Sequence, residues 1–160
     1  MPFNFYAVLL ASLVSFLVGY FWYSPKAFGT IWMQEAGITS EKAKQANRLK
    51  IITLTLFYSF LLALIMPTIV IHQMGALGMV GGDALLAKPS YAAFLTDYRD
   101  AFRTFKHGGL HGFIAGLFIA LPITAINGLF EQKSWKYISI HAGYWIVSLT
   151  IMGAIICGWK

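Results

Sequence analysis

One apolar stretch, residues 107–128, limits most strongly what this chain can fold into. It reads HGGLHGFIAGLFIALPITAING, and a small side chain recurs in it at every fourth position. On a helix this spacing makes one slowly winding stripe of small side chains. Helices in lipid gain little by packing Leu against Leu, so small residues that allow close backbone approach favour association. The expected helix-packing residues are Gly108, Gly112, Gly116, Ala120, Thr124 and Gly128.

The composition indicates that this stretch belongs to a membrane protein. Of the 160 residues, 58% are hydrophobic and 11% are charged, whereas a soluble domain carries about 25% charged residues. The apolar residues fall into four blocks near the roughly 20-residue length that crosses the hydrocarbon core. We therefore predict an all-α integral membrane protein with a single domain over residues 1–160. Its spans are expected at about 5–23, 51–72, 109–130 and 137–157.

The long loop before the third span contains an amphipathic segment at about 90–106. Tyr91, Phe94 and Tyr98 fall on one helical face, whereas Asp97 and Arg103 fall elsewhere. An aromatic face opposite mixed charge predicts a helix that lies in the membrane interface or folds over the mouth of the bundle.

The first span repeats the small-residue pattern of the third. Its row also has a small side chain at every fourth position, which predicts a second closely packed helix. The residues of this row are Ala7, Ala11, Ser15 and Gly19.

The end of the first span carries the most distinctive string of the chain, FWYSPKAFGTIW at residues 21–32. Aromatic residues suit the headgroup level, and a proline disfavours helical geometry in the residue before it. The string resembles the bacterial and fungal membrane family called domain of unknown function 1761, as do Ile140-x-x-Gly143-Tyr144 and the glycine-spaced third helix. The resemblance implies an integral membrane protein and supplies no mechanism. The residues that carry it best are Trp22, Tyr23, Ser24, Pro25, Phe28, Gly29 and Trp32.

Three histidines are expected on one side of the membrane. His107 and His111 are four residues apart on one helix face, a spacing that can hold a metal, and His72 ends the second span. A divalent metal or haem is one interpretation, and interfacial histidines bonded to water or headgroups are the other. No cysteine or carboxylate completes a familiar ligand set, so we expect no bound metal or cofactor. His141 starts the fourth span, on the opposite side.

The spans contain no Asp, Glu, Lys or Arg, which argues against an ion-coupled carrier. A pore formed between copies, lined by small polar residues, remains an alternative. Ordinary interhelical hydrogen bonds of the same residues are favoured over it. These residues are Ser12, Ser15, Ser59, Thr124 and Asn127. No nucleophile, phosphate loop or paired carboxylate set is recognisable, so we expect no enzymatic activity.

The charge pattern bears on partners and orientation. The net charge of +6 lies in loops beside apolar segments, which favours lipid headgroups over nucleic acid as its partner. Loops one and three hold seven Lys and Arg residues and the other side holds five, which weakly favours both termini outside a bacterial inner membrane. The leading hypothesis is a structural or accessory subunit that packs through its small-residue faces, as a homo-oligomer or in a larger complex. The alternatives are a pore or carrier for a small or lipid-like solute and a haem- or metal-binding subunit.

Overall fold

The computed structural model describes residues 3–160, and all regular elements among them are helices. Four segments there are long and apolar enough to cross a membrane, namely α1 with α2, α5, α8 through α9, and α10. This confirms the predicted all-α membrane fold with four spans. In chain order the elements are α1 (Phe5–Ser12), α2 (Val14–Trp22), α3 (Gly29–Ala36), α4 (Ser40–Lys44), α5 (Arg48–Val70), α6 (His72–Met79), α7 (Pro89–Tyr98), α8 (Phe105–Ala115), the π-helical turn η1 (Gly116–Ala120), α9 (Leu121–Phe130) and α10 (Trp135–Gly158).

Polar side chains fix where the later spans begin. Asn47, Thr104 and Ser134 precede α5, α8 and α10, and each side chain accepts a hydrogen bond from a backbone N–H of the first turn. Such caps satisfy donors that have no partner within the helix. The three spans consequently start before the apolar blocks that predicted them.

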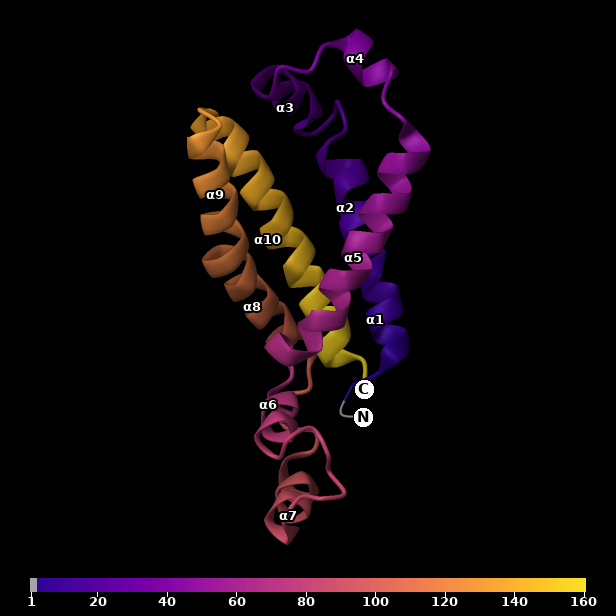
Figure 1. The fold of residues 1–160 in the computed structure, drawn as a ribbon, viewed down its shortest axis with the longest axis vertical. Helices are drawn as coiled ribbons and strands as arrows, with labels where there is room; N and C mark the ends of the chain where they lie inside the picture. Colours follow the sequence, from indigo (N-terminus) through magenta and orange to yellow (C-terminus); the bar gives the residue numbers. More distant parts are fainter. Residues whose placement is uncertain (1–2) are drawn as a thin grey trace.

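The spans form two antiparallel hairpins that together resemble a V (Figure 1). The α1–α2 span packs along α5, and the span from α8 to α9 packs along α10. The hairpins meet near the start of α1 and the end of α10, and they diverge toward α3 and α4 (Figure 1). Where they meet, Ala63, Met66, Met152 and Ile156 are almost fully buried. The hydrophobic core therefore lies at the closed end of the V.

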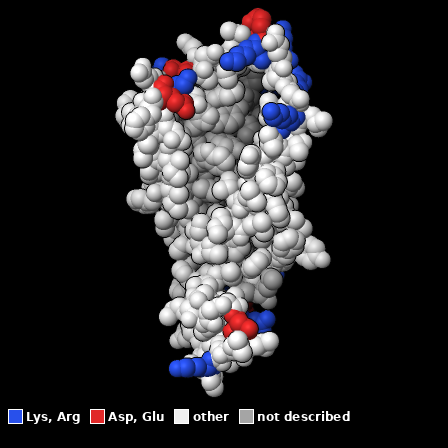
Figure 2. All heavy atoms as spheres, in the orientation of Figure 1, with Lys and Arg blue, Asp and Glu red and all other residues white. Residues whose placement is uncertain are grey.

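Charged side chains on the face drawn in Figure 2 gather at the two ends of the molecule, and the long middle is free of them. The middle carries exposed apolar side chains such as Leu61, Leu64 and Ile123. Apolar exposure of this kind suits contact with lipid chains, because lipid imposes no cost on exposed Leu or Ile.

The glycines of the third span are covered by α10 of the same chain. A side-chain methyl built at Gly112 would overlap the backbone of Leu149, and one built at Gly108 would overlap the backbone of Gly153. Gly116 lies against Ile146 in the same way. The hypothesis that this stripe meets a second chain is therefore wrong for these glycines, because their face is already used within the chain.

The small residues of the first span also face the bundle. Ala7 and Ala11 are fully buried, and Gly19 lies against the ring of Tyr144 from α10. The helix is interrupted at Leu13, between α1 and α2. The Ser59 hydroxyl of α5 donates to the Ser12 carbonyl at this break, so the interruption is also a contact between the spans.

A π-helical turn interrupts the third span. It covers Gly116–Ala120 and precedes Pro122, which is placed in the first turn of α9. A proline has no N–H for the α-helical ladder, and π turns are a known cause of bends in helices. The irregularity near Pro122 is thus a change of helix type upstream of the proline.

The second loop holds two short helices at the closed end of the V, α6 and α7 (Figure 1). The helix predicted over 90–106 is shorter, because α7 ends at Tyr98. Phe102 has a left-handed backbone (φ 60°), and Thr104 then starts α8. A bulky residue in that region breaks helical geometry, which separates the aromatic segment from the third span.

The contact between α8 and α10 predicts that alanine has different effects on stability at two glycines of α8. Gly112→Ala should lower the melting temperature in mild detergent, because overpacking costs about 1–3 kcal/mol. Gly109→Ala is the matched control, since its added methyl would meet only ordinary contacts of 3.7–3.8 Å. Alanine is a better helix former than glycine, so this control should be neutral or slightly stabilising. Equal melting temperatures for the two variants would contradict the packing described here.

Candidate functional site

The string at the end of the first span folds into a closed turn. The Phe28 N–H donates to the Trp22 carbonyl at 3.0 Å, and the Gly29 N–H donates to the Ser24 carbonyl at 2.9 Å. The Trp22 and Phe28 ring centres lie 4.6 Å apart. A side chain at residue 29 would overlap the Tyr23 and Ser24 backbone. The turn therefore requires the glycine, because only a residue without Cβ allows this approach.

This turn is bonded to α10 through its aromatic side chains. The Trp22 indole N–H donates to the Ile140 carbonyl at 3.0 Å, and the Trp32 indole N–H donates to Nε2 of His141 at 3.1 Å. An indole can only donate, so Nε2 of His141 accepts. Nδ1 of His141 then carries the hydrogen of the neutral ring and faces the Tyr23 hydroxyl at 3.0 Å. The contact thus selects one neutral tautomer of His141.

The Tyr23 phenol is held in its protonated form. Burial raises the pKa of Tyr23 well above its usual value, and the neighbouring Tyr144 and Tyr137 raise it further. Nearby, the Tyr144 hydroxyl donates to the Ser15 carbonyl at 2.9 Å. These bonds join the first and fourth spans.

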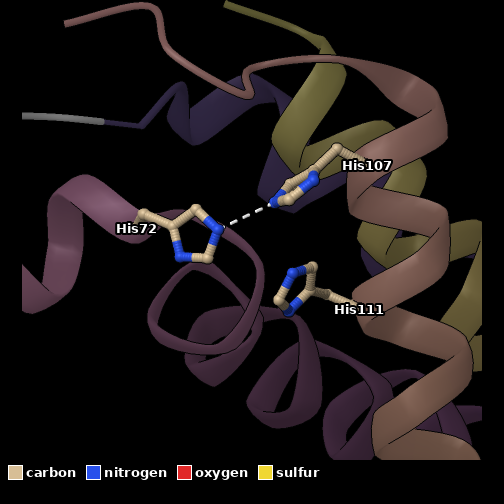
Figure 3. A group of neighbouring side chains, drawn as sticks. All are labelled: His72, His107 and His111. Carbon is tan, nitrogen blue, oxygen red and sulfur yellow. Dashed lines mark hydrogen bonds between the residues drawn. The ribbon is translucent and has the colours of Figure 1, made fainter. Parts of the chain in front are cut away.

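A second cluster lies at the other end of the bundle and contains His72, His107 and His111 (Figure 3). Nε2 of His72 lies 3.0 Å from Nε2 of His107. One ligand nitrogen from each ring can be chosen so that all three lie within 4.8 Å of one another. His72 is exposed and the other two are half-buried, so water reaches the cluster. The structure thus brings together the three histidines that the sequence placed on one side.

Two breaks in the helices position these rings, one at Ile71 and one at Phe102. Ile71 is extended (φ −117°, ψ 107°), which ends α5 and makes His72 the first residue of α6. The adjacent Gln73 is buried, and its amide donates to the carbonyls of Tyr98 and Ala101. Phe102 packs its ring against those of His72 and His107, at centroid distances of 5.7 and 5.1 Å. The second loop therefore holds His72 against α8.

The cluster has the dimensions of a metal site. Nitrogen ligands of a tetrahedral zinc ion lie about 3.4 Å from one another at Zn–N bonds of about 2.0–2.1 Å. His72 of α6 faces His107 and His111 of α8, so the three rings converge on one point from two helices (Figure 3). His141 bonds to the turn after the first span and does not belong to the cluster of His72, His107 and His111.

Comparison with protein families decides the affiliation of the chain. The model of the family described as "Protein of unknown function (DUF1761)" matches residues 6–157. The chain belongs to this family. This confirms the resemblance seen in the sequence. No curated protein and no solved structure matches the chain.

The motifs that resemble the DUF1761 family meet in space. Trp22 and Trp32 come from the first motif, and they bond to Ile140 and His141 at the start of the second. Gly143 lies directly under the Trp22 ring, where an added side chain would come within 2.9 Å of it. In this DUF1761 protein the string at residues 21–32 thus forms one side of a contact between the first and fourth spans.

The small polar residues considered for a pore do not form one surface in this DUF1761 chain. Ser59 bonds to the Ser12 carbonyl of a neighbouring span, and Thr124 bonds to the Ala120 carbonyl of its own helix. Ser15 is buried, whereas Asn127 is exposed. These contacts are those of ordinary packing.

The bond between Trp32 and His141 predicts coupled effects of substitution. Trp32→Phe should lower the free energy of unfolding by about 1 kcal/mol, the usual contribution of one hydrogen bond. His141→Phe should lower it by more, because it also removes the bond to the Tyr23 hydroxyl. The double variant should lose little more than His141→Phe alone, because the bond that Trp32→Phe removes is then already absent. The free energy of unfolding of each variant is measured by denaturation in mild detergent.

The exposed Trp135 offers the matched control. Trp135→Phe should leave the free energy of unfolding unchanged. Additive losses in the double variant would contradict the contact between Trp32 and His141.

Proposed function

We propose that this DUF1761 protein is a metal-binding membrane protein that holds a first-row divalent transition metal ion at His72, His107 and His111. The observation that carries the proposal is the convergence of three imidazoles from two helices, with ligand nitrogens within 4.8 Å of one another. Two of these histidines are one turn apart on α8 and the third comes from the start of α6. Imidazole suits zinc, copper, nickel and iron ions.

The ligand set defines the chemistry of the proposed site. Three neutral imidazoles leave the charge of the ion uncompensated and leave at least one coordination position for water or an anion. The hydrogen bond between Nε2 of His72 and Nε2 of His107 at 3.0 Å must break when both nitrogens bind the ion, and the donating ring then carries its hydrogen at Nδ1. A protonated imidazole has no free lone pair for a metal, so metal affinity is expected to fall in acidic solution.

The proposed site lies at the water end of the second and third spans. The distribution of Lys and Arg over the loops supports an orientation in which this end faces the outside of a bacterial inner membrane. The ion would then exchange with the external solution.

Substitution of each ligand tests the proposal. His72→Ala, His107→Ala and His111→Ala should each weaken Zn²⁺ binding by at least about a hundredfold, because even changes outside the ligand shell cost about 10–100-fold. The measurement is isothermal titration of the purified chelator-treated protein in mild detergent. The visible spectrum of the Co²⁺ form reports the ligand geometry.

The fourth histidine supplies the control. His141→Gln should bind Zn²⁺ as the unchanged protein does, because residue 141 lies at the far end of the bundle. Zn²⁺ should also raise the melting temperature of the unchanged protein and not that of His107→Ala. Equal Zn²⁺ affinity of His107→Ala and the unchanged protein would overturn the proposal.

A further inference from the structure

A groove of about 730 Å³ runs along the face of α8 beside the histidine cluster. Apolar side chains line most of its length, including Leu110 and Phe113 of α8 and Phe102 of the preceding loop. Three polar residues lie at one end, where α8 begins, and they are Thr104, Lys106 and His107. The fourth is Thr150 of α10, beside Gly109, and its hydroxyl donates to the Ile146 carbonyl of its own helix.

The groove therefore has a direction relative to the membrane. Lys106 and His107 lie in the first turn of the third span, at its water end. Phe113 is seven residues further along α8, which is about 10 Å deeper at 1.5 Å per residue. A molecule lying in the groove would place one end among polar groups and the remainder along lipid-facing apolar side chains.

Gly109 is the residue that keeps the groove open. Unlike Gly108 and Gly112, it has no backbone of α10 in close contact, since an added methyl would meet Ala154 and Thr150 only at 3.7–3.8 Å. Close helix packing therefore does not require a glycine here. Its missing side chain leaves space in the groove wall.

The charge of the groove selects its occupant. Lys106 is its one charged side chain among the described lining residues, and no carboxylate lines it. Basic residues at the boundary of a span attract anionic lipid headgroups, by about 1 kcal/mol for each residue. We propose that this groove is a binding site for an anionic phospholipid, with the phosphate of the headgroup at Lys106 and one acyl chain along Leu110 and Phe113.

This lipid site does not depend on the proposed metal site. The two share His107, but His72 and His111 do not line the groove. Lipid binding is therefore tested in the chelator-treated protein, and a failure of metal binding leaves the result unaffected.

Native mass spectrometry of the full chain tests the lipid site, with phosphatidylglycerol and phosphatidylcholine of identical acyl chains as probes. The unchanged protein should bind phosphatidylglycerol more tightly, and Lys106→Gln should reduce this preference about fivefold, the equivalent of one interfacial charge. Gly109→Leu should weaken the binding of both lipids, because its side chain fills the groove.

Matched variants distinguish lipid binding in the groove from lipid contact elsewhere on the apolar surface. Lys44→Gln, at the opposite end of the molecule, should keep the preference for phosphatidylglycerol. His72→Ala should keep it too, although it removes a proposed metal ligand. Melting temperatures confirm that each variant is folded.

Two results would overturn the lipid site. One is equal affinity of the unchanged protein for the two lipids, which would mark ordinary lipid contact. The other is a dimer that carries no lipid while the monomer does, which would mean that a second copy covers the groove.

Discussion

Close backbone contact between α8 and α10 is the constraint on which the rest of the structure depends. Gly108 and Gly112 allow the two helices to approach until neither position has room for a methyl group. In lipid this contact gains dispersion energy that larger side chains would prevent. It fixes α8, which carries two of the clustered histidines, and α10, which receives the aromatic turn. Both ends of the protein are therefore organised from one helix pair.

The histidine cluster was partly predictable from the sequence. The four-residue spacing of His107 and His111 places both on one helix face, and the length of the spans places His72 on the same side. Their actual convergence was not predictable, because it depends on the extended backbone of Ile71 and on the hydrogen bonds of Gln73. Those features belong to a loop whose sequence has no regular periodicity.

The aromatic turn shows a different limit of sequence reasoning. The sequence around Trp22 and Tyr23 predicts interfacial aromatics before a helix-stopping proline, which accounts for their place at the end of the first span. Their partners lie 118 residues away in the chain, so no local pattern indicates the bonds to Ile140 and His141. A histidine that accepts from one tryptophan is recognisable only once both rings are placed. The four spans, by contrast, follow directly from apolar length.

The π turn at Gly116–Ala120 has a consequence for the register of the hairpin. Positions four residues apart on an α-helix drift by about 40° at each step, because a turn holds 3.6 residues. Over the whole stripe this drift would reach about 200° and would carry Gly128 to the far side of the helix. One wider turn absorbs an extra residue and returns part of that rotation. Gly128 accordingly still contacts Ile138 of α10. The wider turn thus keeps small residues that are spaced by four on the face of the third span that contacts α10.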